Sequence, residues 1–342
     1  MRLSETEERL KVVVGICHHT GELIDRCLKS VRDSFDMGLD IKVVVCTSTE
    51  RVFEQAVTLK DTGGPAHKRN LIARWYGNDS RYLIFLDDDV EISPYCIWNL
   101  VAFMEAKQEC AMGFAKILKM DRRDVFDDCG SWLTPTGFLW SRAQDNQLDR
   151  GQFDESCQVL ASKSATCIVR RDVFEQVGGF DASYYILAEE TDLAWRVWLG
   201  GGECWYIPQA VSWHAFGTAL KPKQAFYTLE RIHYRGCANY LNLLATNLGF
   251  SRLIWILPVH LSIWIASAGS FLLRGDWRRC GLILKAITSA VWHLPRIWKK
   301  RRQVQRTRQR TDRELFRVIY RAPKLSYYTA RFVRYVTQGL HG

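Results

Sequence analysis

The sequence lacks any pair of cysteines in the CxxC spacing, although 11 cysteines are scattered from Cys17 to Cys280. This distribution is typical neither of a zinc site nor of a disulfide framework, and it indicates a protein of the reducing cytosol. Residues 1–10 contain no apolar run and are polar and rich in glutamate, so we expect no export signal. The chain has 342 residues, enough for one large domain plus an appendage. Hydrophobic residues make up 47% of it, enough for a sizeable core.

Acidic residues are also scarce, but only in the last part of the chain. Residues 274–342 contain 18 Lys and Arg but only 3 Asp and Glu, a balance of +15. Of the 47 basic and 37 acidic residues in the chain, 29 and 34 therefore belong to residues 1–273, a balance of −5. An acidic body with a basic tail indicates an anionic partner for the tail, either a membrane surface or a nucleic acid.

Strand and helix patterns alternate along the first 120 residues. Short apolar runs predict buried strands at residues 12–16, 41–45 and 82–87, and helical periodicity predicts helices at 23–31 and 64–77. This succession favours an α/β protein with a mostly parallel sheet covered by helices. Residues 121–160 are expected to form loops near a site, before a strand at 165–169 and a short helix at 171–177.

Three consecutive carboxylates follow the third predicted strand, at Asp87, Asp88 and Asp89. The carboxyl edge of such a sheet is where ligands bind, and adjacent carboxylates repel unless something compensates their charge. A divalent cation such as Mg²⁺, which prefers oxygen ligands and phosphates, would do so. The alternative is a helix N-cap, because Ser93 and Pro94 are a good helix start, but one cap requires only one aspartate.

A second acidic block opens an apolar helix, where the helix dipole favours negative charge. Glu189, Glu190 and Asp192 lie there, and Asp192 can pair with Arg196 four residues later. Glu190 is rotated about 100° from Glu189, so it can point into a cleft. The alternative is that all three acids only stabilise the helix N-terminus. His214, after the next predicted strand, is either a core histidine or a third metal ligand.

Six segments, in this order, resemble family 2 glycosyltransferases, and the resemblance spans roughly residues 10–245. They are residues 12–31, 63–70, 82–90, 168–181, 189–196 and 206–214. The resemblance implies a GT-A fold and transfer of a sugar from a nucleotide-diphosphate donor with inversion. The chain is most similar to bacterial envelope-polysaccharide enzymes of the rhamnosyltransferase type, whose acceptors are often lipid-linked.

Site roles follow from the resemblance by position. Asp87 and Asp89 are similar to the outer residues of a DXD site for Mg²⁺ or Mn²⁺, with Asp88 between them, and His214 is the candidate third ligand. Asp87 and Asp88 would also contact the nucleotide sugar.

The remaining roles concern the donor and the acceptor. Glu190 stands where the family places its catalytic base, which is more often Asp. Arg69 is similar to an arginine that contacts the nucleotide. Cys17 and His18 occupy positions usually held by Thr and Tyr beside the nucleotide base. Residues 43–49 lack the acidic residue that normally recognises the nucleotide base, so the donor's identity stays open.

The apolar run 253–273 contains no Asp, Glu, Lys or Arg. As a straight helix it would be about 32 Å long, which matches a bilayer core. A single span would place the basic cluster 299–302 outside, against the positive-inside rule, because a nucleotide-sugar site belongs in the cytosol. We therefore expect helices in the interface or entering one leaflet, with arginines on anionic lipid and five Trp side chains at the interface. These are Trp255, Trp264, Trp277, Trp292 and Trp298. A true span, a soluble helical cap and an oligomer interface remain alternatives.

Together, the patterns and the resemblance predict three regions: a GT-A-like catalytic domain at 1–245, membrane-associated helices at 246–310 and a basic tail at 311–342. The predicted function is metal-dependent, inverting sugar transfer from a nucleotide-diphosphate donor to a lipid-linked or envelope glycan acceptor, at the cytoplasmic face of the plasma membrane. Another nucleotide-diphosphate or phosphoryl transferase is the enzymatic alternative. A nucleic-acid-binding protein is the other alternative, but it leaves the apolar run unexplained.

Overall fold

The computed structural model describes residues 9–144, 146–216, 220 and 228–338. Its strands are β1 Lys11–His18, β2 Asp40–Thr47, β3 Val57–Lys60, β4 Tyr82–Asp87, β5 Val90–Ile92, β6 Cys110–Lys119, β7 Phe126–Asp128, β8 Ser131–Leu133, β9 Leu139–Ser141, β10 Cys157–Gln158, β11 Thr166–Arg170 and β12 Glu203–His214. The helices of the first part are α1 Ile24–Arg32, α2 Pro65–Tyr76, α3 Cys96–Ala106, α4 Arg171–Gln176, the 3₁₀-helix η1 Ala182–Tyr184 and α5 Glu189–Leu199. Those of the last part are the π-helix η2 Glu230–Arg235, α7 Gly236–Asn247, α8 Phe250–Leu273, α9 Trp277–Trp292, α10 Leu294–Arg306, α11 Asp312–Ile319 and α12 Leu325–Gln338.

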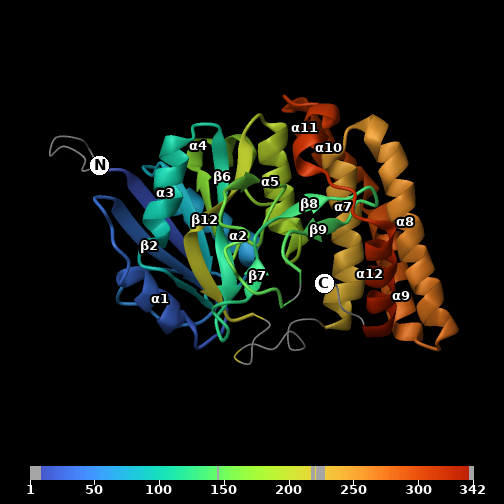
Figure 1. Ribbon diagram of the computed structural model, residues 1–342, viewed down its shortest axis with the longest axis horizontal. Coiled ribbons are helices and arrows are strands. Elements are labelled where there is room, and N and C mark those ends of the chain that lie inside the picture. Colours follow the sequence, from blue (N-terminus) through green and yellow to red (C-terminus); the bar gives the residue numbers. More distant parts are fainter. Residues whose placement is uncertain (1–8, 145, 217–219, 221–227, 339–342) are drawn as a thin grey trace.

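One twisted sheet forms the centre of the body, in the order β10-β12-β6-β11-β4-β1-β2-β3 (Figure 1). The pairs β4–β1, β1–β2, β2–β3 and β6–β12 are parallel. Strand β11 is antiparallel to both of its neighbours, β4 and β6. The sheet is therefore mostly parallel, and the predicted α/β fold is confirmed.

Strand β4 explains how a continuous apolar run supports two cores. Its side chains alternate between the faces of the sheet. Leu83 and Phe85 join the core beneath α2, α4 and α5, while Ile84 and Leu86 join the core beneath α1 and α3. Both faces are buried, as the run of apolar residues predicts.

The predicted elements are all present, with small differences at their ends. Helix α3 begins at Cys96 rather than at Pro94, and its N-cap residue Tyr95 makes no side-chain cap bond. The segment 121–160 contains the short strands β7 to β10 between its loops. These strands were not predicted, because a strand of two or three residues is too short to show a periodic pattern. Helix α4 is followed by Gly178 and Gly179, whose φ angles of 82° and 65° suit glycine.

Helices α7 to α12 stand beside the sheet (Figure 1) and continue its core. Leu253 and Ile256 of α8 and Ile319 of α11 are buried in the same core as β4 and α5. A third cluster, among η2, α7, α8, α9 and α12, contains Trp264 and Phe271. The residues on either side of the predicted boundary at 245 thus form one packed unit.

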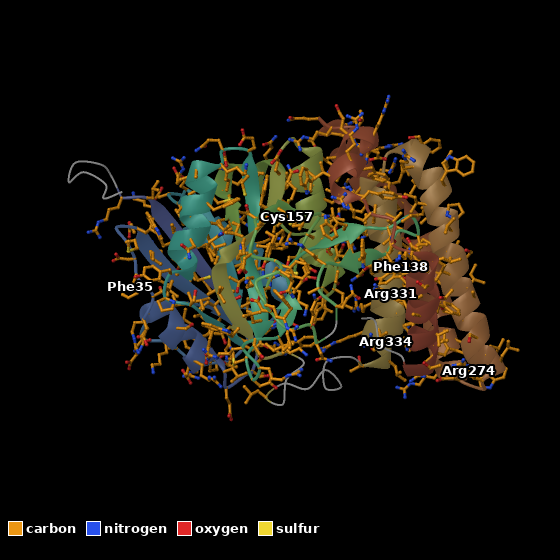
Figure 2. The ribbon with its side chains drawn as sticks, in the orientation of Figure 1. Phe35, Phe138, Cys157, Arg274, Arg331 and Arg334 are labelled. Carbon is orange, nitrogen blue, oxygen red and sulfur yellow. The ribbon has the colours of Figure 1, made fainter. Side chains whose placement is uncertain are left out.

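A polar contact also fixes α8 to the body. His260 is fully buried, and its Nδ1 donates to the Thr136 carbonyl at 2.8 Å while its Nε2 accepts from Trp264 Nε1 at 2.9 Å. Phe138, labelled in Figure 2, lies 4.1 Å from the His260 ring between ring centroids. At the far end of α8, Arg274 donates to the Val336 carbonyl at 2.7 Å. The prediction that Trp264 lies at a membrane interface is wrong, because it is 1% exposed and packs inside the helical cluster.

Candidate active site

The three aspartates lie where β4 ends and the chain turns back into β5, and each has a different partner. Asp87 Oδ1 accepts from Arg69 Nη2 at 2.8 Å. Asp88 Oδ2 is 2.9 Å from His18 Nδ1 and accepts from the His19 amide at 3.2 Å. None of the three caps a helix in the described structure, since α3 begins seven residues after Asp89. The helix-cap alternative is therefore wrong.

Asp87, Asp89 and His214 form a group of possible metal ligands whose donor atoms all lie within 4.8 Å of one another. Strand β12 brings His214 beside Val90 of β5, and its Nε2 lies 3.4 Å from Asp89 Oδ1. Its Nδ1 lies 2.9 Å from Asp127 Oδ2, so this carboxylate can orient the ring toward the group, as in many metal sites. Two carboxylates and one imidazole fit a hard or borderline divalent cation.

The charges of these residues also agree with a site for a divalent cation. Burial alone would lower the pKa of His214, but the carboxylates of Asp89 and Asp127 outweigh it and raise the pKa to about 10. Burial raises the pKa of Asp87, and Arg69 opposes this effect. The protein therefore gathers negative charge at one point and balances it with a proton on His214, a role that a divalent cation can take over.

Arg69 joins the two acidic blocks. It lies on α2, is 1% exposed, and its guanidinium lies over the Phe180 ring at 5.1 Å. Besides Asp87, it pairs with the second block through Nη1, which is 3.5 Å from Glu189 Oε1. A contact between Arg69 and the nucleotide stays a prediction.

Glu189 and Glu190 open α5 but occupy different environments. The preceding residue, Ala188, has a left-handed φ of 69°, which turns the chain sharply into the helix. Glu189 is buried against Arg69, whereas Glu190 is half-buried and lines a cavity. Burial, together with the adjacent charge of Glu189 and a hydrogen bond to it, raises the pKa of Glu190 well above the usual value. The expectation that Glu190 faces a cleft is thus confirmed by its position.

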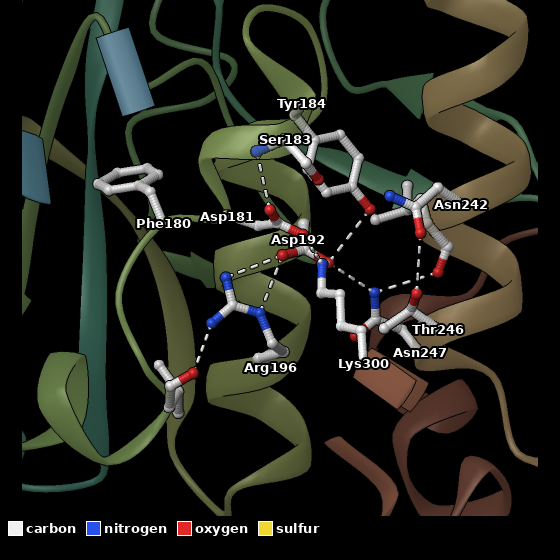
Figure 3. Close-up of polar contacts among 12 residues, drawn as sticks. Phe180, Asp181, Ser183, Tyr184, Asp192, Arg196, Asn242, Thr246, Asn247 and Lys300 are labelled. Carbon is white, nitrogen blue, oxygen red and sulfur yellow. Dashed lines mark hydrogen bonds and ion pairs between the residues drawn. The ribbon is translucent and has the colours of Figure 1, made fainter. Parts of the chain in front are cut away.

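Asp192 is a structural carboxylate (Figure 3). It is fully buried and pairs with Arg196 at 2.8 Å, as the spacing predicts. Asp192 Oδ1 also accepts from Asn247 at 3.0 Å and from Lys300 at 2.9 Å. Burial alone would raise the pKa of Asp192, but Arg196 and Lys300 hold it well below its usual range. This network joins α5, which carries Glu190, to α7 and α10.

The cavity at Glu190 has a volume of about 380 Å³. On the sheet side it is lined by Asp127, Asp128 and Lys163, and on the helical side by residues of η2, α7 and α12. Asp127 is also the partner of His214, so the cavity begins where the metal-ligand group ends. A volume of this size is typical of a small-molecule site.

Cys17 and His18 lie at the end of β1, next to the acidic edge. The Cys17 side chain is buried and faces the Pro65 carbonyl at 3.7 Å, and burial raises the pKa of its thiol to about 12. The His18 carbonyl accepts from Lys68 Nζ at 2.6 Å, and this lysine also reaches Ser48. Both predicted residues are therefore beside the site, and their contact with a nucleotide stays a prediction.

The sequence patterns missed several polar residues at the site. Asp127 and Lys163 form an ion pair of 2.6 Å at the cavity wall. Asp127 comes from a segment expected to be loop, and Lys163 lies three residues before β11 begins at Thr166. Asp61 follows the unpredicted strand β3 and lies 3.4 Å from His67. The adjacent acids Asp127 and Asp128 in a polar segment were the sequence signal that could have indicated this part of the site.

Comparisons with known proteins point in one direction. The sequence model of a family described as "Glycosyl transferase family group 2" matches residues 82–295. No curated protein sequence matches the chain. The crystal structure of GalNAc-T7 with UDP, GalNAc and Mn²⁺ is similar with a TM-score of 0.56 and 15% identity, and the match covers 70% of this chain and 48% of that one. This chain thus spans about half the length of GalNAc-T7.

Two further solved structures match most of the chain. S. aureus TarS 1–349 has a TM-score of 0.53 and 14% identity, with 87% of this chain and 86% of that one covered. The mannosyltransferase PcManGT from Pyrobaculum calidifontis, in complex with GDP-Man and Mn²⁺, has a TM-score of only 0.47 and 15% identity, with 88% and 86% covered. At such identities GalNAc-T7 and TarS show a shared fold and no more.

Proposed function

Because the chain belongs to the glycosyl transferase family group 2, we propose that it transfers a sugar from a nucleotide-diphosphate donor to a hydroxyl group of an acceptor, with inversion. The observation that carries this proposal is the single line of contacts at the sheet edge. It runs from the ligand group Asp87, Asp89 and His214, through Asp127, into the cavity where Glu190 lies.

Glu190 is the proposed general base. As the acceptor oxygen attacks the anomeric carbon, the acceptor proton passes to the Glu190 carboxylate, and the bond between the anomeric carbon and the phosphate oxygen breaks. The electron pair of that bond leaves with the nucleoside diphosphate. A raised pKa makes Glu190 a stronger base than an ordinary glutamate, which suits this proton transfer near neutral pH.

The other acids of the site have supporting roles. Glu189 pairs with Arg69, which also pairs with Asp87, so this arginine links the end of β4 to the start of α5. When bound at Asp87, Asp89 and His214, a divalent cation such as Mg²⁺ or Mn²⁺ would stabilise the negative charge on the leaving diphosphate as a Lewis acid.

We further propose that the acceptor is lipid-linked or an envelope glycan, and that the enzyme works at the cytoplasmic face of the plasma membrane. Among the described residues, one helix, α8, is long and apolar enough to cross a membrane, and 33% of its most apolar stretch is buried against the protein. The outer surface of α8 and α9 is rich in exposed apolar side chains. They include Ile254, Trp255, Val259, Ile265, Leu273, Trp277, Leu284, Val291 and Trp292. This surface supports a helix pair lying in the interface.

The sugar-transfer proposal is tested by screening nucleotide sugars for hydrolysis or transfer, with and without added Mg²⁺ or Mn²⁺. We expect one donor to be consumed only when a divalent metal is present, because the cation held by Asp87 and Asp89 would stabilise the charge on the leaving diphosphate. Asp89→Ala should reduce turnover by at least about 10²-fold while the chain stays folded.

Asp79→Ala, at an exposed turn on the other end of β4, is the matched control and should behave as wild type. Full turnover in excess EDTA would contradict the metal dependence, and no consumption of any donor would contradict sugar transfer itself.

A further inference from the structure

The cavity at Glu190 is closed on one side by α12, a helix that lies beyond the residues matched by the family. Tyr327, Arg331 and Arg334 of α12 line the cavity. Figure 2 shows Arg331 and Arg334 where α12 meets the body. Tyr335 and Val336 on the same helix are buried in the helical cluster, so α12 is held in place by its own apolar side chains.

Arg331 is fixed in position but makes no ion pair with any described residue. It is half-buried, and its Nη1 donates to the Leu139 carbonyl at 3.0 Å and to the Tyr327 hydroxyl at 2.5 Å. Both acceptors are neutral. A partly buried guanidinium without a carboxylate partner loses hydration that its neutral acceptors only partly replace, so an anion in the cavity would be bound favourably.

Two of the three acids of the cavity do not supply this partner, because the protein has already satisfied them. Among the described lining residues, three are acidic: Asp127, Asp128 and Glu190. Asp127 pairs with Lys163 and His214. Asp128 accepts from the Ser162 hydroxyl at 3.0 Å and from the backbone amides of 129, 130 and 163.

Glu190 and the arginines face the same space. Tyr240 of α7 also lines the cavity, and the charges of Arg331 and Glu190 both lie close enough to shift its pKa in opposite directions, within a net rise caused mainly by burial. The cavity is therefore bipolar, with a proton-accepting carboxylate on one wall and guanidinium groups on another. A molecule that fills it must present a hydroxyl to one wall and negative charge to the other.

We propose that the acceptor carries a phosphate or carboxylate group, bound by Arg331 of α12, while its hydroxyl lies at Glu190. This inference rests on the proposed sugar transfer, because Glu190 defines the hydroxyl end. Guanidinium groups bind both oxyanions through paired N–H donors, so phosphate and carboxylate share this chemistry. A lipid-linked phosphate and an acidic glycan residue are the two sources.

The test is direct binding to the full-length protein, using three probes of similar size: glucose 1-phosphate, glucuronate and methyl glucoside. EDTA is present throughout, so that phosphate is not drawn to a cation at Asp87 and Asp89. We expect at least one anionic probe to bind about tenfold or more tightly than methyl glucoside. Arg331→Gln should remove this preference and leave methyl glucoside binding unchanged.

Two further variants keep the result interpretable. Arg313→Gln, on the exposed side of α11, removes a charge of the same kind and should keep the preference. If the glutamine variant does not fold, Arg331→Lys keeps the charge without the paired geometry. This variant should bind the anion more weakly than wild type but more tightly than it binds methyl glucoside.

Equal binding of all three probes to the wild type would overturn the inference, and so would an anion preference that survives in the glutamine variant. A preference for phosphate alone indicates a phosphorylated acceptor, and one for carboxylate alone indicates an acidic glycan. Donor consumption is measured separately, so a failure of sugar transfer shows as missing turnover and not as a changed probe preference.

Discussion

At the scale of single residues, two adjacent glutamates are separated by their surroundings. Glu189 is held beside the permanent charge of Arg69, while Glu190 is half-buried, carries a hydrogen bond to Glu189 and faces the cavity. One helical step of about 100° is enough to give the two carboxylates these different partners. Burial raises the pKa of both carboxyls, and Arg69 opposes this rise at Glu189. Perturbed pKa values in a cavity commonly mark functional residues.

Glu190→Gln should lower kcat by at least about 10²-fold, because the amide cannot accept the acceptor proton. Donor binding should be retained, since Gln keeps the size and hydrogen-bonding capacity of the side chain. In the wild type, the base acts only when ionised, so activity should fall as pH drops through the raised pKa of Glu190. This decline should begin well above pH 4.5, the usual value for glutamate.

The measurements are steady-state kinetics across pH and donor binding by titration calorimetry. Glu54→Gln, at an exposed position of the body, is the matched control and should leave both unchanged. If Glu190→Gln instead lost donor affinity and kept its kcat, the residue would be a binding group and not the base.

At the scale of elements, α10 shows why a run of basic residues is a poor guide to a surface. The basic run 299–302 lies in the region whose arginines were expected on anionic lipid, yet two of its four residues bind within the protein. Lys300 pairs with Asp181 at 2.6 Å and with Asp192 at 2.9 Å. Arg301 donates to the carbonyls of 245 and 248 at the end of α7. The inner face of α10 thus uses its charges to join α5 and α7.

Lys300→Met should destabilise the protein by about 1.5–3 kcal/mol, the range for a lost hydrogen bond to a charged group. The substitution leaves Asp181 and the buried Asp192 without one of their cations, while Arg196 still offsets part of the cost. Lys299→Met, at the neighbouring exposed position, should change the free energy of unfolding by less than about 0.5 kcal/mol. Chemical denaturation of both variants measures the difference, and equal unfolding midpoints would show that the network in Figure 3 adds no stability.

Local patterns predicted the parts of the site that lie within one element. The apolar run of β4 with its three acids, the pairing of Asp192 with Arg196, and the cleft-facing Glu190 all follow from strand and helix periodicity. The contact of Arg69 with Glu189, 120 residues away, depends on how α2 and α5 pack, and no spacing encodes it. The arginines of α12 were missed for the same reason, since only the folded chain brings them to the cavity.

At the scale of the whole molecule, helices α8 and α9 carry many exposed aromatic and aliphatic side chains. Trp255, Trp277 and Trp292 are 72%, 73% and 84% exposed, in contrast to the buried Trp264. Large exposed apolar side chains are unfavourable in water and suit an interface with a membrane. Exposed basic residues such as Lys299 and Arg302 on the neighbouring α10 add an electrostatic attraction that salt weakens.

Replacing Trp255, Trp277 and Trp292 together by Ser should weaken binding to vesicles of anionic phospholipid by at least about tenfold, and high salt should not mask the difference. The apolar contribution that is lost does not depend on ionic strength, unlike that of the basic residues. Cosedimentation at low and high salt measures both the apolar and the electrostatic contribution to vesicle binding. Trp75→Ser, on the body and 63% exposed, is the matched control. Wild-type protein that stays in the supernatant at low salt would contradict the membrane proposal.

The antiparallel strand β11 has a consequence for the order in which the chain can fold. It lies between β4 and β6, so these two strands are never neighbours, although β6 follows β4 closely along the chain. During synthesis, the hydrogen-bonding edges of β4 and β6 that meet β11 stay open until residues 166–170 leave the ribosome. Non-local pairing of this kind slows folding, and open strand edges favour association between chains. The nascent protein thus passes through a vulnerable interval of about 80 residues of growth, from the end of β4 at Asp87 to the arrival of β11.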